Sequence, residues 1–271
     1  MKRIDLVKIE HDTKIGQECP YIEPNILEDC IFYEDGIAIG FYIKQMPEKM
    51  CKLADLADAE FNSKRVKKTT TFRNSTINIA KKHKISCQKA CKLFPSDCVK
   101  QLCTIIGSIP LNRQMGRNYH NKATIHLEKK AQPFIKAMLL LAKESEALIK
   151  EILPEQYEAQ KKLFEQVNKK WQFGNLWTSS ISNYNISAPF HRDTGNIVGA
   201  VNVIITKRLN AKGGNLHVPD YNATMDSANN SILVYPAWKN IHGVTPITPT
   251  HEGGYRNSLI FYPLKAFVNL K

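Results

Sequence analysis

The feature that most constrains this chain is an ordered series of polar residues in its last third. His191, Arg192 and Asp193 are consecutive, His242 follows, and Arg256 comes fourteen residues after His242. Two imidazoles and one carboxylate can bind one face of Fe(II) and leave the opposite face open. A later arginine can pair with a carboxylate through two parallel hydrogen bonds. The series predicts a non-haem iron oxygenase that consumes 2-oxoglutarate and O2.

The surroundings of these residues predict that each lies on or beside a strand. The run "ISNYNISAPFHRD" alternates apolar and polar residues, so His191 and Asp193 lie on the same face. His242 follows the apolar run "SILVYP". In "RNSLIFY" one strand face carries Arg256, Ser258, Ile260 and Tyr262. We predict an α+β chain with a double-stranded β-helix core of the jelly-roll or cupin-like kind; a β-sandwich with scattered surface polar groups is the alternative.

The rest of the sequence predicts further strands and helices and a division of the chain into two parts. The paired glycines of "LNAKGGN" mark a loop before the strand "NLHVP", and the chain between Asp193 and His242 has room for about three strands. Residues 133–170 have helical apolar spacing interrupted at Pro154, and we expect these helices to brace the barrel. Earlier, "CIFYEDGIAIGFYIKQM" predicts two strands around an Asp-Gly turn, and a helix starts at Pro47. We divide the chain into a mixed α/β extension, residues 1–103, and an oxygenase domain, residues 104–271.

Several segments together resemble a known family. The series "HRDTGN", "GGNLHVPDY", "SILVYPAWKNIHGVTPI" and "YRNSLIFYPLK" is similar to the TET/JBP dioxygenases, as are "TIIGSIPLNRQMGRNYHNKA" and "WTSSISNYNISAPFHRD" upstream. The resemblance covers roughly residues 104–271, and the compact form is closer to fungal and phage members than to the large animal enzymes. It implies oxidation of the 5-methyl group of a pyrimidine in DNA, with Fe(II), 2-oxoglutarate and O2.

The resemblance also implies roles for individual residues. His191, Asp193 and His242 would be the iron ligands, and Arg256 with Ser258 would bind the far carboxylate of 2-oxoglutarate. Asn196 and Tyr262 match residues that contact the flipped base. Two departures stand out. Leu264 occupies the position of a base-contacting histidine of animal members. Asn121 falls at or near an arginine of the upstream basic segment, whose role the resemblance leaves to Arg113, Arg117 or Lys122. We accordingly expect Arg113 and Arg117 as further residues that bind the cosubstrate.

The charge distribution independently favours a nucleic-acid partner. Residues 61–130 contain 16 lysines and arginines against 2 acidic residues, whereas the whole chain has 38 against 25. Positive charge concentrated in one segment is typical of a phosphate-binding surface, although a solvated face or a localisation signal is the plainer alternative. The partner we expect is double-stranded DNA with a flipped target nucleotide. The expected backbone contacts are Lys64, Arg65, Lys67, Lys68, Arg73, Lys81, Lys82 and Lys84.

Cysteine content and hydropathy bear on the compartment. Seven cysteines without a small disulfide framework favour a reducing environment, and no apolar run reaches 18 residues. We expect an intracellular monomer without a signal peptide or membrane contact, in the host cytoplasm if the gene is viral and in the nucleus if it is eukaryotic.

His83, Cys87 and Cys91 have a spacing that could place them on one helix face as a zinc site; packing of the small cysteines on the buried side of a basic helix is the alternative.

Three other functions share parts of this pattern. A thymine hydroxylase making 5-hydroxymethyluracil would keep every feature above. A protein side-chain hydroxylase would keep the metal residues and Arg256 but leaves the basic segment unexplained. A DNA-binding module on an inactive oxygenase fold would not need the intact series of ligands.

Overall fold

The computed structural model describes residues 1–94, 97–98 and 100–270. Among these residues, ten strands form one large, mainly antiparallel sheet in the order β1-β2-β3-β13-β9-β16-β7-β5-β4, with β6 beside the far end of β5. Their bounds are β1 (Lys2–Asp5), β2 (Cys30–Glu34), β3 (Ile37–Ile43), β4 (Thr69–Phe72), β5 (Lys100–Ile109), β6 (Asn121–Lys122), β7 (Ser179–Tyr184), β9 (Asn202–Leu209), β13 (Ile232–Tyr235) and β16 (Tyr255–Tyr262).

A smaller sheet faces the large one, and a strand pair closes one edge. The small sheet has the order β12-β11-β14-β8, and β10 pairs with β15. Their bounds are β8 (Ala188–His191), β10 (Ala211–Gly213), β11 (Leu216–Val218), β12 (Ala223–Met225), β14 (His242–Val244) and β15 (Ile247–Pro249). The two facing sheets are the layers of a double-stranded β-helix, which confirms the predicted fold class.

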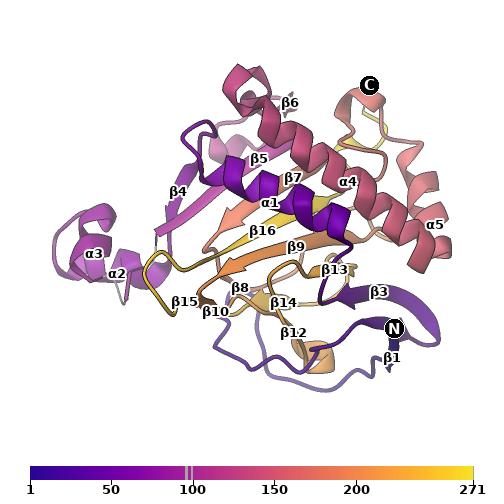
Figure 1. The fold of residues 1–271 in the computed structure, drawn as a ribbon, viewed down its shortest axis with the longest axis horizontal. Coiled ribbons are helices and arrows are strands. Elements are labelled where there is room, and N and C mark those ends of the chain that lie inside the picture. Colours follow the sequence, from indigo (N-terminus) through magenta and orange to yellow (C-terminus); the bar gives the residue numbers. More distant parts are fainter. Residues whose placement is uncertain (95–96, 99, 271) are drawn as a thin grey trace.

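Helices cover the other face of the large sheet. α1 (Glu48–Asn62) and α4 (Gln132–Ile152) lie side by side across it, and α5 (Pro154–Phe164) packs against α4 (Figure 1). Their buried side chains, such as Phe61, Phe134 and Met138, join one hydrophobic core with Leu259 and Phe261 of β16. Each large side chain removed from water in this way contributes roughly 1.5–3 kcal/mol. The helices therefore brace the sheet from behind and leave its second face for a site.

Strand β16 shows how two-residue periodicity separates the two faces. Leu259 and Phe261 point into the helical core, whereas Arg256, Ser258, Ile260 and Tyr262 line a cavity on the opposite face, as the sequence pattern predicted. β16 is central, since it pairs with both β7 and β9, and Leu259 is in register with Ser182 and Ile205.

The N-terminal part of the chain belongs to the same sheet and core. β3 pairs with β13, and the predicted Asp-Gly hairpin between β2 and β3 is present, with positive φ at Asp35 and Gly36. The helix expected at Pro47 starts there as α1. The boundary drawn between residues 103 and 104 falls inside β5, so both parts share one sheet. Among the described residues, none of the helices combines the length and apolar character that a membrane span requires.

Three local expectations were wrong. The chain between Asp193 and His242 holds five strands rather than about three, because four of them have only three or four residues. The helix after Pro154 ends at Phe164, before Val167 makes a bridge with Val268. The continuous basic helix expected to carry His83, Cys87 and Cys91 is instead two short helices.

These two helices form a separate lobe between β4 and β5. They are α2 (Asn74–Lys82) and α3 (Cys87–Leu93), and positive φ at Lys84 lies in the turn that separates them. Ser86 then caps α3 by accepting a hydrogen bond from the Lys89 amide. Figure 1 shows this lobe standing away from the sheets at the side of the molecule.

Candidate metal centre and cosubstrate pocket

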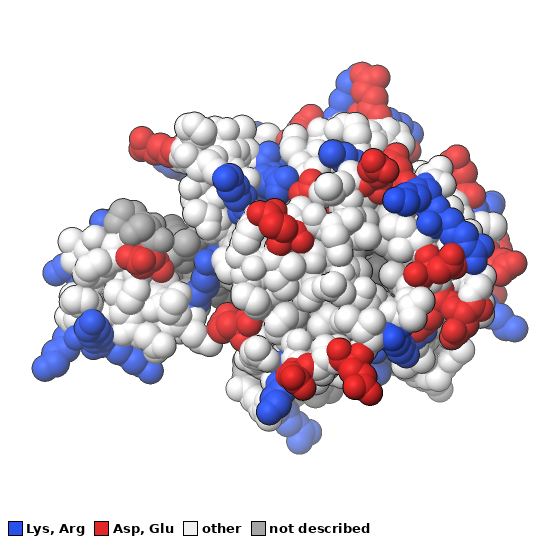
Figure 2. All heavy atoms as spheres, turned by 90° about the horizontal axis from the view of Figure 1, so that it is seen from below, with Lys and Arg blue, Asp and Glu red and all other residues white. Residues whose placement is uncertain are grey.

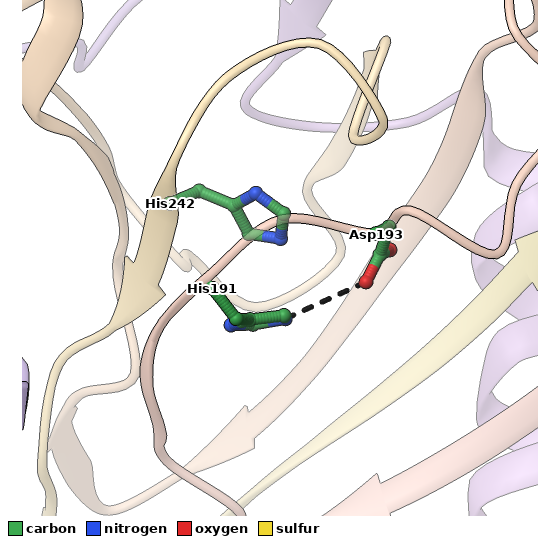
Figure 3. Close-up of side chains that lie close together, drawn as sticks. All are labelled: His191, Asp193 and His242. Atoms are coloured by element: carbon green, nitrogen blue, oxygen red, sulfur yellow. Dashed lines mark ion pairs between the residues drawn. The ribbon is translucent and has the colours of Figure 1, made fainter. Parts of the chain in front are cut away.

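The structure brings together the three predicted metal ligands from separate segments. His191 ends β8, His242 begins β14, and the two are register partners in the small sheet. Asp193 lies in the loop after β8. The imidazole centroids of the two histidines are 4.3 Å apart, and His191 Nε2 is 3.5 Å from Asp193 Oδ1 (Figure 3). One donor atom from each residue lies within 4.8 Å of the others, so the group could hold a metal ion.

Backbone carbonyls orient both histidines. His191 Nδ1 is 2.8 Å from the Pro189 carbonyl oxygen, and His242 Nδ1 is 3.1 Å from that of Asn240. A proton on each Nδ1 would donate to these carbonyls, which leaves each Nε2 as a lone-pair donor. Burial, with a smaller contribution from the neighbouring His191, lowers the pKa of His242 to about 3. The imidazole is therefore neutral at physiological pH, the form that binds metals.

Two amides fix the carboxylate of Asp193. Asn202 Nδ2 donates to Asp193 Oδ2 at 3.2 Å, and Asn196 Nδ2 lies 3.5 Å from the same oxygen. Asn196 Nδ2 also donates to Asn202 Oδ1 at 2.9 Å. Burial raises the pKa of Asp193, while His191 and the two amides act in the opposite direction. The second oxygen, Oδ1, faces His191, and the three donors resemble one face of the coordination sphere of non-haem Fe(II).

Asn202 was missed by the sequence reasoning. It is an isolated amide in the strand "VNVII" of β9, and its side chain is almost completely buried. A polar residue in an otherwise apolar strand signals a buried hydrogen-bond partner, because burying an unpaired amide is costly. A polar residue in an apolar strand can be recognised from the sequence, but the sequence does not show which residue Asn202 contacts.

Arg256 lies at the other end of the same cavity with an unsatisfied positive charge. Its side chain is 3% exposed, Nη1 donates to Ser258 Oγ at 3.0 Å, and Nε has no hydrogen-bond partner. No carboxylate of the described residues forms an ion pair with it. Burial, with a further contribution from Arg208, lowers the pKa of Arg256 to about 10, so it remains a cation. A buried arginine without an acidic partner requires an anionic ligand, and the far carboxylate of 2-oxoglutarate fits it.

The cavity between the two sheets connects the metal ligands to Arg256. Its volume is about 310 Å³, within the range of about 300–1,000 Å³ typical of small-molecule sites. Tyr235 Oη and Asn183 Oδ1 are buried in its wall without partners. Neither was predicted, and both are available to a polar ligand. Apolar walls come from Ile181, Ile186, Ile204, Leu216, Val244 and Ile260.

The predicted base-contacting residues also line this cavity. Asn196, Tyr262 and Leu264 are among its lining residues, and Asn196 and Leu264 form an isolated bridge. Burial raises the pKa of Tyr262, Asp193 raises it further, and Arg117 acts in the opposite direction. Asp193 and Arg117 are therefore both close enough to the phenol to act on its charge.

The alternative cosubstrate residues lie outside the cavity. Arg113 is exposed, Arg117 is half-buried, and neither is among the residues that line the cavity. Lys122 Nζ donates to Ser108 Oγ at 3.0 Å, and Asn121 is exposed on β6. Of the residues predicted to bind the cosubstrate, Arg256 and Ser258 are thus the two that line the cavity.

The predicted backbone-contacting residues fall into two groups. Those that follow α1 are engaged within the protein: Arg65 pairs with Glu60, Lys67 with Glu128, and Lys68 Nζ donates to two carbonyls. Lys64 is exposed. Arg73, at the end of β4, donates through Nη2 to the Ile247 carbonyl at 3.3 Å. The others lie exposed on the lobe: Lys81, Lys82 and Lys84.

The suggested zinc ligands do not form a cluster. His83 stacks on Phe94 with centroids 4.7 Å apart, whereas Cys87 and Cys91 pack around the buried Ala80 and Ala90. Within the described parts of the chain, the group formed by His191, Asp193 and His242 is the one whose geometry suits a metal.

Comparison with known proteins agrees with this geometry. The Tet_JBP model, described as the oxygenase domain of the 2OGFeDO superfamily, matches residues 114–265. Among solved structures, NgTET1 in complex with 5mC DNA is similar with a TM-score of 0.57 and 13% identity, covering 95% of this chain and 84% of that one. An oxidoreductase of the 2OG-Fe(II) oxygenase family from Burkholderia pseudomallei aligns with a TM-score of 0.44 and 11% identity, over 82% of this chain and 84% of that one. No curated protein sequence matches the chain.

The fold and the matched domain define an Fe(II)- and 2-oxoglutarate-dependent dioxygenase. The family can be stated more narrowly, because the matching model covers more than half of the chain. The chain belongs to the TET/JBP family.

Proposed function

We propose that this dioxygenase oxidises the 5-methyl group of 5-methylcytosine in duplex DNA to 5-hydroxymethylcytosine. The observation that carries the DNA assignment is the segment 61–130, with 16 basic against 2 acidic residues, inserted in and beside a dioxygenase fold. The similarity to a TET enzyme in complex with 5mC DNA supports the same substrate class.

In this proposal His191, Asp193 and His242 hold Fe(II), and Arg256 with Ser258 binds the far carboxylate of 2-oxoglutarate. With O2, this centre supplies the oxidising chemistry that hydroxylates a C–H bond and releases succinate and CO2. The protein contributes position: the Asn202 and Asn196 amides hold Asp193, and the two backbone carbonyls hold the imidazoles.

The target methyl group must reach a buried centre. His242 is 4% exposed, so a pyrimidine stacked in a duplex cannot approach it, and the nucleotide must flip out of the helix. Tyr262 offers an aromatic face on which the flipped base can stack, and Asn196 offers an amide at its edge. Both side chains line the cavity that contains the metal ligands, so a base held by them would present its methyl group to the oxidising centre.

A thymine hydroxylase is the second candidate, and one residue favours it. Leu264 lines the base end of the cavity, where it offers neither a donor nor an acceptor to separate cytosine from thymine. The exocyclic groups at C4 differ in hydrogen-bonding sense between the two bases. Asn196 Nδ2 already donates to Asp193 and Asn202, so Asn196 meets a base through Oδ1, which can accept from the amino group of cytosine or from N3–H of thymine and excludes neither base.

One assay separates these functions. Purified protein with Fe(II) and 2-oxoglutarate is incubated with a duplex containing 5-methylcytosine at one site, or with the same duplex unmethylated, and the nucleosides are analysed by mass spectrometry. We expect 5-hydroxymethylcytosine from the methylated duplex alone. 5-Hydroxymethyluracil from both duplexes would establish the thymine hydroxylase. Succinate formation stimulated by a protein extract but not by DNA would overturn the DNA proposal and favour a protein hydroxylase.

A further inference from the structure

The α2–α3 lobe, of which the structure describes residues 74–94 and 97–98, has its own small core. α2 and α3 pack on each other around Ala80, Ala90 and Cys98. At its base, Asn74 Nδ2 lies 3.4 Å from Glu18 Oε1, next to the contact of Arg73 with β15. The lobe precedes the residues matched by the family model, so the family's shared machinery does not explain it.

The charge on the lobe is predominantly positive. Its sequence contains five lysines and one acidic residue, Asp97. All five lysines are exposed, and none forms an ion pair with another described residue: Lys81, Lys82, Lys84, Lys89 and Lys92. Figure 2 shows this charge along the outer edge of the lobe, whereas acidic and basic side chains are interspersed over the main body. Mutual repulsion of these cations is relieved when a polyanion binds.

The lobe is connected to the cavity by a continuous sheet face. Ile181 and Asn183 of β7 line the cavity, and their register partners on β5 are Ile105 and Cys103. Partners in adjacent strands share a face, and both β5 residues are half-buried. The face that carries the cavity wall therefore continues over β5 and β4 to the point where the lobe begins.

The dimensions of β5 suit a duplex. Its ten residues span about 30 Å, which corresponds to roughly nine base pairs of B-form DNA. The lobe stands at one end of β5, and the segment with Arg113 and Arg117 follows the other end. The residues beside the cavity lie near the middle of the strand. Positive charge thus lies beyond both ends of β5, on either side of the residues next to the cavity.

We propose that the α2–α3 lobe is an arm that binds the phosphates of duplex DNA on one flank of the target nucleotide. The proposal rests on the proposed function, since it takes DNA as the substrate. Half the length of β5 corresponds to about five base pairs. The arm would therefore contact the DNA backbone at about five base pairs from the flipped base and beyond. It reads no sequence, because lysines on phosphates give affinity and register alone.

The first test compares two variants with equal charge change. In the lobe variant the five lysines are replaced by glutamine; in the control variant Lys136, Lys143, Lys150, Lys161 and Lys162 of α4 and α5 are replaced instead. Binding to a 24-base-pair methylated duplex is measured by fluorescence anisotropy at several salt concentrations. We expect the lobe variant to bind roughly tenfold or more weakly at 0.1 M salt and to lose about three units of salt slope, at ~0.9 per phosphate contact. A lobe variant equal to the control overturns the proposal.

The second test uses the wild-type protein, so it does not depend on the folding of a variant. Two duplexes carry the methylated base four base pairs from one end or from the other. Because the arm lies on one side of the cavity, one of the two duplexes should bind several-fold more weakly. In the lobe variant this preference should disappear or reverse, because Arg113 and Arg117 remain beyond the other end of β5. Equal affinity of the wild-type protein for the two duplexes contradicts a one-sided arm.

These tests separate the arm from the proposed function. If the wild-type protein oxidises DNA while the lobe variant matches the control in affinity and salt slope, the arm is wrong and the proposed function stands. If the wild-type protein neither binds nor oxidises DNA, the proposed function fails and the arm with it. A thermal melt of each variant verifies that it is folded.

Discussion

The cavity and the lobe use charged residues in opposite ways. In the cavity, Arg256 and His242 are almost completely buried, Asp193 is half-buried, and all three are held by hydrogen bonds with neighbouring side chains or the backbone. On the lobe, five lysines point into solvent on two short helices. Charges in a dry site interact strongly and with defined geometry, whereas exposed charges are screened and contribute small, additive amounts. Substitutions in the cavity should therefore change turnover sharply, and substitutions on the lobe should change only affinity, in small steps.

The largest effect expected in this comparison is loss of a metal ligand. Replacing His191, Asp193 or His242 with alanine should abolish succinate formation, because two remaining donors do not retain Fe(II) in the required arrangement. DNA affinity should stay unchanged, since these side chains do not contact the backbone. Iron content is measured by elemental analysis and succinate by mass spectrometry. His251→Ala, on an exposed turn, is the control. Near wild-type turnover in any of the three would remove that residue from the ligand set.

The next effect concerns the cosubstrate end of the cavity. Arg256→Lys keeps the charge but loses the planar fork, so we expect the KM for 2-oxoglutarate to rise about 10- to 100-fold, as the loss of a charge-assisted hydrogen bond predicts. Iron content should not change. Arg208→Lys is the control, because Arg208 is the register partner of Arg256 but pairs with Asp226. An unchanged KM in Arg256→Lys would transfer the role to Arg113 or Arg117.

A smaller effect tests the support of the metal ligands. Asn202→Ala removes a hydrogen bond to Asp193 Oδ2, so Fe(II) affinity should fall about 10- to 100-fold, the usual cost of losing such a partner. The readout is iron retention during dialysis against a chelator, which does not depend on turnover. Asn257→Ala is the matched control: Asn257 is equally buried on the neighbouring strand but donates to Asp58. Equal iron loss in both variants would show that Asn202 acts only through stability.

The sequence predicted the cavity better than the lobe, and the reason is physical. Two-residue periodicity fixes which side chains of β16 share a face, so the pattern of the strand alone places Arg256 and Ser258 together. In the same way, the order of the candidate ligands along the chain was enough to predict a metal site. By contrast, hydrogen bonds between distant residues, such as Asn202 with Asp193, depend on tertiary packing that has no local pattern.

The structure of the lobe was predicted less well from the sequence. Basic composition predicted a phosphate-binding surface, but composition does not reveal which lysines remain free. Positive φ at Lys84 divided an expected helix in two, and His83 stacked on Phe94 instead of joining Cys87 and Cys91. In the sequence, Arg65 and Lys67 look no different from the lysines of the lobe. In the structure, they form ion pairs with Glu60 and Glu128, whereas the lobe lysines form none with the described residues.

That difference within the basic segment gives the smallest predicted effect. Neutralising Lys64, Arg65, Lys67 and Lys68 together was expected from the sequence to flatten the salt dependence of DNA binding. The structure shows Arg65 Nη2 2.6 Å from Glu60 Oε1 and Lys67 Nζ 2.7 Å from Glu128 Oε1, while Lys68 Nζ contacts the Phe61 and Ser63 carbonyls. A phosphate must compete with these partners, although each exposed pair is worth only about 0–1 kcal/mol. We therefore expect this variant to lose about one unit of salt slope or less, at ~0.9 per phosphate contact, against about three for the lobe variant. Anisotropy titrations of both variants on the same duplex make the comparison. A larger loss in the variant at residues 64–68 would place the main backbone contact beside α1 and reverse the order of the two basic groups.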